Sequence, residues 1–192
     1  MESPSQSPCC VWLTGLPGSG KTTIAEALAA RLAHAGYRTE VLDGDSLRKT
    51  LSPDMGFTRQ DRDRHIHRVG MLAASRVRAG RLVLCATISP YRLARQECRA
   101  MLDAGRFIEV FVDAPLAVCE ARDPKGLFRQ ARRGVIANFT GISDPYEPPK
   151  TPEVTLDTAN HSAEENVRQL QDALTARGIL PQSLAAARTA RA

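Results

Sequence analysis

The segment Gly15–Thr22 constrains this chain most, because it reads GLPGSGKT and matches G-x-x-x-x-G-K-(S/T) at every fixed position. An apolar run, residues 9–13, precedes it and a helical pattern, residues 24–29, follows it, as a phosphate-binding loop requires. Glycines let backbone N–H groups approach phosphate oxygens, and the N-terminus of the helix adds partial positive charge. In this motif the lysine ammonium reaches the β- and γ-phosphates, and the threonine hydroxyl ligates Mg²⁺. The predicted nucleotide-binding residues are Gly15, Gly18, Ser19, Gly20, Lys21, Thr22 and Thr23.

Apolar strand patterns alternate with helical patterns along the rest of the chain. Strands are predicted at 11–14, 39–42, 82–88, 107–112 and 153–156, and helices at 21–35, 45–49, 59–79, 93–104, 115–122 and 163–177. This alternation predicts an α/β doubly wound fold with right-handed crossovers, in which ligands bind beyond the carboxyl ends of the strands. We place the second strand, 39–42, beside the strand that leads into the glycine loop.

The chain of 192 residues is long enough for one domain with a core of its own. We expect a disordered Ser/Pro/Gln-rich tail at 1–8, a single domain at 9–180 and a frayed Ala/Arg tail at 181–192. Residues 123–149 combine low hydrophobicity with many arginines and several turn residues. They predict a mobile lid that is partly helical near 127–133.

The formal net charge of +5 comes largely from arginines in two internal stretches and the C-terminal tail. No nucleic-acid recognition motif accompanies them, so we expect small anionic substrates rather than nucleic acid. The five cysteines form no C-x-x-C pair, which predicts buried free thiols rather than disulfides or a zinc site. No apolar run approaches membrane-spanning length and no signal peptide is recognised, so we expect a cytoplasmic enzyme that binds no membrane.

Two carboxylates, Asp43 and Asp45, follow the second predicted strand at the edge where ligands bind. One of them can hold Mg²⁺, and Asp45 can orient or deprotonate an acceptor hydroxyl. Asp45 equally fits as the N-cap of the short helix that follows, and spacing alone does not separate these roles. Arg48 lies one helical turn later and is predicted to face the same pocket.

Cationic side chains gather in two stretches that suit an anionic acceptor and a lid closing over phosphates. They are Arg48, Arg59, Arg62, Arg64 and Arg68 in the first stretch, and Lys125, Arg129, Arg132 and Arg133 in the lid. A solvated helix face and an exposed loop are the alternatives for several of them. Phe57 and Phe139 lie in polar stretches, where the residues alone favour local packing over stacking on a base.

Six segments of the chain resemble the adenylylsulfate (APS) kinase family. They are Leu42–Asp45, Met55–Phe57, Ile88–Arg92, Phe107–Asp113, Asp123–Leu127 and Asn138–Ile142, in family order and spacing within residues 11–158. The resemblance implies a P-loop NTPase fold, with α/β/α layers around a mainly parallel five-stranded sheet. It implies transfer of the γ-phosphate of ATP, with Mg²⁺, to the 3′-hydroxyl of adenosine 5′-phosphosulfate (APS), giving PAPS for sulfate assimilation. It also implies a homodimer and leaves a sulfurylase partner open.

The resemblance also implies roles for individual residues. The implied catalytic residues are Lys21, Asp45 and Ser89, the metal-binding residues are Thr22 and Asp45, and the APS-binding residues are Asp43, Asp45, Arg48, Phe57, Arg62, His65, Ile88, Ser89, Lys125, Gly126, Leu127 and Phe139. Phe57 and Phe139 would sandwich the adenine of APS, which reverses the preference for packing. Ser89 matches a serine proposed to carry phosphate transiently, and a structural serine at the strand end is the alternative.

This chain departs from the family pattern at a few positions. His65 stands where the family usually has asparagine near the phosphosulfate; a neutral histidine donates one hydrogen bond, and a protonated one adds charge. Pro17 and Ser19 replace the commoner loop serine and alanine at variable positions, and Arg95 diverges without an evident consequence. Two other functions remain open. One is a related P-loop kinase for another small anionic acceptor, and the other is a GTPase-type regulator, which the lack of an N-K-x-D motif disfavours.

Overall fold

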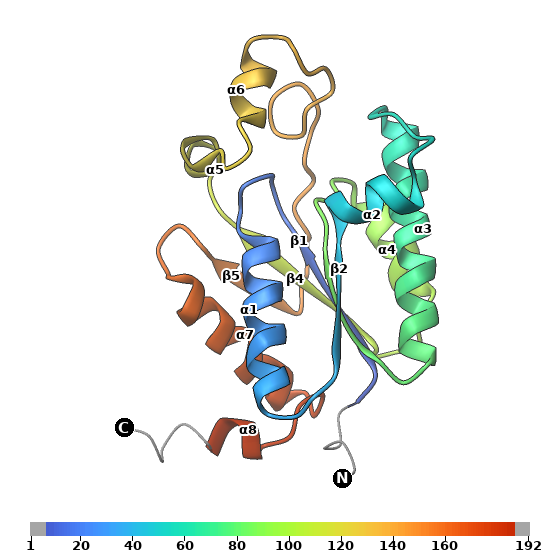
Figure 1. The fold of residues 1–192 in the computed structure, drawn as a ribbon, viewed down its shortest axis with the longest axis vertical. Coiled ribbons are helices and arrows are strands. Elements are labelled where there is room, and N and C mark those ends of the chain that lie inside the picture. The colour runs from blue at the N-terminus through green and yellow to red at the C-terminus, as the bar shows by residue number, and fades with distance from the viewer. Residues whose placement is uncertain (1–6, 187–192) are drawn as a thin grey trace.

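The computed structural model describes residues 7–186, in which five parallel strands form one sheet (Figure 1). The strands are β1 (Cys9–Thr14), β2 (Thr39–Asp43), β3 (Leu82–Ala86), β4 (Phe107–Asp113) and β5 (Val154–Asp157), in the order β2-β3-β1-β4-β5. The helices are α1 (Lys21–His34), α2 (Gly44–Leu51), α3 (Arg59–Arg78), α4 (Arg92–Ala100), α5 (Leu116–Arg122), α6 (Leu127–Arg132), α7 (Ala163–Ala176) and α8 (Ser183–Ala186). The predicted three-layer α/β/α fold is confirmed, with every strand pair parallel.

Helices cover both faces of the sheet, so the central strand β1 is buried along its whole length. Successive side chains of a strand point to opposite faces. Val11 therefore packs with Leu28 of α1 and Leu170 of α7, whereas Trp12 packs with Ile66 of α3 on the other face. Within residues 7–186, no helix is both long enough and apolar enough to cross a membrane.

Our placement of the second strand beside the loop strand is wrong, because β3 lies between β2 and β1. Cys85 of β3 stands opposite Trp12 on one side and Leu42 on the other. The physical reason is burial. The near-continuous apolar strand β3 can be covered on all sides, whereas β2 carries Thr39 and Glu40 and is only partly buried, as suits an edge strand.

Hydrogen bonds at the helix ends correct two further predictions. Asp43, not Asp45, caps α2, because its carboxylate accepts the Ser46 amide at 3.0 Å. Pro115 is the N-cap of α5 rather than its first helical residue.

Strand β3 ends at Ala86 instead of residue 88, so the following residues form a loop at the carboxyl edge of the sheet.

The predicted N-terminal tail, 1–8, ends too late, and the predicted C-terminal tail, 181–192, begins too early. The Ser7 amide donates to the Ile179 carbonyl at 3.1 Å, and Arg106 donates to the Pro8 carbonyl at 3.0 Å. At the other end, α8 is held to α7 because the Gln171 amide donates to the Leu184 carbonyl at 3.1 Å. Ser7, Pro8 and Leu184 are therefore bonded to the body of the fold, and the predictions for 1–6 and 187–192 lie outside the described residues.

The last part of the predicted lid, residues 139–149, is bonded to the body of the domain. Tyr91 donates its hydroxyl to Asp144 at 2.7 Å, and the hydroxyls of Thr14 and Tyr146 are 3.0 Å apart. The Arg92 amide donates to Glu147 at 2.9 Å. We therefore keep the prediction of a mobile lid only for the stretch that carries α6 and the turns around it.

Arg95 of α4 lies in the interior beneath this junction, with 1% of its surface exposed. Its guanidinium donates to the Glu109 carboxylate at 2.7 Å, the Ser89 carbonyl at 2.6 Å and the Glu147 carbonyl at 2.7 Å. One buried cation thus joins β4, the loop after β3 and the end of the lid segment. The departure at Arg95 has a structural consequence that its sequence position did not reveal.

Candidate functional site

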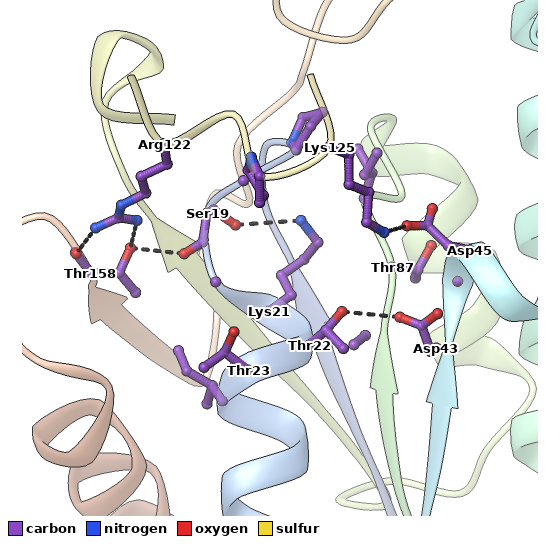
Figure 2. Close-up of a pocket in the computed structure, with 18 of the residues that line it drawn as sticks. Ser19, Lys21, Thr22, Thr23, Asp43, Asp45, Thr87, Arg122, Lys125 and Thr158 are labelled. Atoms are coloured by element: carbon purple, nitrogen blue, oxygen red, sulfur yellow. Dashed lines mark hydrogen bonds and ion pairs between the residues drawn. The ribbon is translucent and has the colours of Figure 1, made fainter. Parts of the chain in front are cut away.

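A cavity of about 800 Å³ opens at the carboxyl ends of the strands, between the glycine loop, α2 and the lid (Figure 2). This volume is typical of sites for cofactor-sized ligands. Of the predicted site residues, the cavity is lined by Gly18, Ser19, Gly20, Lys21, Thr22, Thr23, Asp43, Asp45, Arg48, Arg62, His65, Ile88, Ser89, Lys125, Leu127 and Phe139. Gly15, Phe57 and Gly126 are not among its lining residues.

The glycine loop is shaped by close backbone approaches that a larger residue would prevent. A Cβ at Gly15 would lie 2.4 Å from the Val112 carbonyl oxygen. Gly18 has φ +73°, and a Cβ there would lie 3.0 Å from the Cys119 carbonyl oxygen. The loop can therefore pack tightly on β4 and α5 while it leads directly into α1.

The Lys21 ammonium folds back over the loop that precedes it. It donates to the Gly15 carbonyl at 2.9 Å, the Leu16 carbonyl at 2.6 Å and the Ser19 hydroxyl at 3.4 Å. Burial lowers the pKa of Lys21 to about 8, although Asp45 and Asp43 favour its charged form. The cation is thus held at the place where the motif puts phosphate.

Asp43 and Asp45 face different partners across the same cavity (Figure 2). The Thr22 hydroxyl donates to the Asp43 carboxylate at 3.0 Å, whereas Asp45 forms an ion pair with Lys125 of the lid. Burial alone would raise the pKa of Asp43, but hydrogen bonds from the Ser46 amide and the Thr22 hydroxyl hold it below its usual value. Asp43 is therefore an ionised carboxylate beside the loop, and Asp45 links α2 to the lid.

Two arginines that line the cavity, Arg48 and Arg62, both contact the Phe57 ring. The Arg48 guanidinium lies 4.6 Å from the centre of the Phe57 ring, and that of Arg62 lies 5.8 Å away. Arg62 also donates to the Phe57 carbonyl at 3.1 Å. Phe57 is 54% exposed, so the cation–π contacts fix its position without covering its ring.

Phe139 is buried against Phe128 in an edge-to-face contact with ring centres 5.0 Å apart. It also lines the cavity. Phe139 therefore packs locally, as the residues alone favoured, and it also borders the cavity.

His65 lines the cavity and is only 4% exposed. Its Nδ1 lies 2.9 Å from the Ser52 hydroxyl. Burial, followed by the charges of Arg48 and Arg68, lowers the pKa of His65 to about 4. The ring is therefore neutral at physiological pH.

The Ser89 hydroxyl is buried and lies within hydrogen-bond distance of Trp12 and Thr14. It accepts from the Trp12 indole at 3.0 Å and lies 3.0 Å from the Thr14 hydroxyl. The residue is 1% exposed and has φ +41°, a left-handed conformation that its surroundings must hold in place. Arg95 does so through the Ser89 carbonyl.

Sequence reasoning missed the part of the cavity beside Ser19, where Arg122 and Thr158 meet (Figure 2). Arg122 donates to the Thr158 hydroxyl at 3.2 Å, and that hydroxyl donates to the Ser19 carbonyl at 2.8 Å. Thr158 follows the last strand, so the rule that identified Asp43 applied to it too. Arg122 gave no such signal, because a basic residue in the last turn of a helix is ordinary.

The parallel sheet, the glycine loop entering α1 and the Lys21–Thr22–Asp43 cluster define a P-loop nucleotide-binding protein. Residues 7–157 match the family model described as adenylylsulphate kinase. The adenylyl-sulfate kinase of Microcystis aeruginosa is 51% identical over 175 residues, covering 91% of this chain and 96% of that protein. The chain belongs to the adenylylsulphate kinase family.

Solved structures resemble the fold over the same range. The Mycobacterium tuberculosis APS kinase CysC, in complex with AMPPNP and APS, has a TM-score of 0.83 and 40% identity, covering 88% of this chain and 99% of that one. The hexameric APS kinase from Thiobacillus denitrificans has a TM-score of 0.68 and 34% identity, covering 91% of this chain and 30% of that longer one.

Proposed function

We propose that this protein transfers the γ-phosphoryl group of ATP to the 3′-hydroxyl of APS, giving ADP and PAPS. One observation carries the proposal: Lys21 and Thr22 of α1 line the same cavity as Arg48 of α2 and Arg62 and His65 of α3. Phosphoryl transfer depends on positioning and on neutralising charge, and this cavity offers groups for both. The proposal agrees with the family membership of the chain.

On the donor side, Lys21 binds the β- and γ-phosphates of ATP after releasing the loop carbonyls that it now contacts. The Thr22 hydroxyl and the Asp43 carboxylate, 3.0 Å apart, are oxygen donors of the kind that Mg²⁺ prefers. Mg²⁺, when bound there, neutralises phosphate charge. We predicted Thr22 and Asp45 as the ligands of Mg²⁺. The hydrogen bond between Thr22 and Asp43 supports Asp43 as a further ligand, directly or through water.

On the acceptor side, Arg48, Arg62 and Lys125 supply positive charge for the phosphosulfate of APS. Asp45 orients the 3′-hydroxyl or accepts its proton once Lys125 has turned to the ligand. Phe139 offers a face to the adenine from within the cavity. Phe57 lies outside it and completes the sandwich only if its loop moves inward.

Three further points belong to the proposal. Ser89 serves as a structural residue, since its hydroxyl is already bonded to Trp12 and Thr14. The chain forms a homo-oligomer, most simply the dimer implied by the family resemblance, and association with a sulfurylase stays open. Its five free, buried cysteines and its use of ATP favour the reducing cytoplasm.

The test is to incubate the folded protein with Mg-ATP and APS and to identify the products by mass. We expect ADP and PAPS in equal amounts, and far less of both in the same time from the Lys21→Ala variant. Folded wild-type protein that makes no PAPS, but phosphorylates another small anionic alcohol, would favour the related-kinase alternative. Preference for guanine nucleotides would favour the GTPase-type regulator.

A further inference from the structure

A buried serine, Ser52, contacts the imidazole of His65, which lines the cavity. Ser52 is fully buried at the end of α2. Its hydroxyl lies 2.9 Å from His65 Nδ1, and it has no other hydrogen-bond partner among residues 7–186. The other ring nitrogen, Nε2, has no protein partner in this part of the chain, while the imidazole itself lines the cavity.

A neutral imidazole carries one proton, on Nδ1 or on Nε2, and the partner of one nitrogen fixes the state of the other. If Nδ1 carried the proton, the Ser52 oxygen would accept it, and the hydroxyl's own proton would be buried without an acceptor. If Nε2 carries it, the Ser52 hydroxyl donates to the bare Nδ1 and both groups are satisfied. Leaving a buried donor unpaired is costly, so the second arrangement is favoured.

The charges around the ring agree with this arrangement. Arg48 of α2 and Arg68 of α3 face His65 and oppose its protonation, whereas Asp45 of α2 favours it. Burial and the two arginines prevail, and the ring stays neutral. An anionic ligand drawn in by these cations presents acceptor oxygens, to which only an N–H can bond.

We propose that Ser52 is a positioning residue that holds His65 as the Nε2–H tautomer, so that His65 donates one uncharged hydrogen bond to an anionic oxygen of the acceptor. The inference rests on the proposed function for the identity of the acceptor. In this proposal Ser52 and His65 together supply one N–H donor, as an asparagine amide could at position 65. Because this donor is neutral, the hydrogen bond orients the acceptor without adding positive charge beside Arg48 and Arg68.

The direct test is long-range ¹H–¹⁵N NMR of protein labelled with ¹⁵N-histidine, with the His65 signals assigned by their loss in His65→Gln. Wild-type protein without ligand should show a protonated Nε2 and an unprotonated Nδ1. The Ser52→Ala variant should show a mixture of tautomers. A protonated Nδ1 in the wild type overturns the proposal, whether or not any variant folds.

Steady-state kinetics give the second readout. Ser52→Ala should raise the KM for APS roughly tenfold, as expected for a misdirected hydrogen bond to a charged group, with the KM for ATP unchanged. Thr50→Ala removes an exposed hydroxyl of the same helix, bonded to the Ser46 carbonyl, and should change neither constant. Equal effects of Ser52→Ala on both substrates would mark Ser52 as merely structural. Wild-type protein that makes no PAPS contradicts the proposed function, while the NMR result still decides the tautomer.

Discussion

Replacing Arg95 with methionine should destabilise the protein far more than replacing a surface arginine. Methionine fills much of the space left by the arginine stem, so a cavity is a minor part of the effect. What is lost is one buried cation with three acceptors, the Glu109 carboxylate and the Ser89 and Glu147 carbonyls. Glu109 keeps only a longer contact with Arg99, at 3.4 Å, and the two carbonyls lose this donor.

Removing one partner of a buried ion pair typically costs ~3–5 kcal/mol, because the other charge stays buried. For a chain of this size each kcal/mol lowers Tm by ~2–4 °C, so the expected fall is roughly 6–20 °C. Arg76→Met is the matched control. Arg76 pairs with Glu40 at 3.1 Å, but its side chain is 48% exposed, and such surface pairs contribute ~1 kcal/mol or less.

The assay is thermal and urea unfolding followed by circular dichroism, at the same protein concentration for each variant. We expect the double variant Arg95→Met/Glu109→Gln to recover part of the loss, because it removes the uncompensated carboxylate. A fall in stability equal to that of Arg76→Met would refute the reasoning. So would a double variant no more stable than Arg95→Met alone.

Four further predictions concern Lys21 and Arg48. Lys21→Ala should lower kcat by about 10²–10³-fold, and near-wild-type turnover in the PAPS assay would contradict its role. Arg48→Ala should raise the KM for APS by about 10–100-fold, the loss of a charge-assisted contact, and a similar rise for ATP would argue against a place on the acceptor side. Since the pKa of Lys21 is about 8 in the free protein, kcat/KM for ATP should fall as pH rises above 8. The pKa of Lys21 is about 8 in the folded protein against 10.5 for an ordinary lysine, so between these pH values the unfolded chain binds more protons. Lys21 therefore makes the free energy of unfolding rise with pH in this window, and Lys21→Met should flatten both profiles.

The glycine loop and the alternation of strands and helices predicted the fold well, because both rest on local patterns. The order of strands is a different matter. The position of β2 at the edge follows from how completely each strand is covered, and we misjudged it by assuming that consecutive strands are neighbours. The partly polar start of β2, at Thr39 and Glu40, was the available signal.

The sequence predicted which residues lie at the candidate site when they directly follow a strand. It did not predict which side chains contact one another there. Spacing placed Asp43 and Asp45 together, but only the backbone path shows that Asp43 caps α2 and meets Thr22 while Asp45 reaches the lid. The roles of Arg95 and Ser52 could not be predicted for a related reason. Their partners lie on other elements of the fold or many positions away, and no local pattern records such contacts.

The chain contains a single tryptophan, and its place gives the protein an intrinsic optical probe. The Trp12 ring is fully buried and stacked on Phe107, and its indole N–H donates to the Ser89 hydroxyl at 3.0 Å. Ser89 belongs to the loop after β3, which lines the cavity. Indole emission therefore comes from one defined position, and a ligand that shifts this loop alters the polarity around the fluorophore without any attached label.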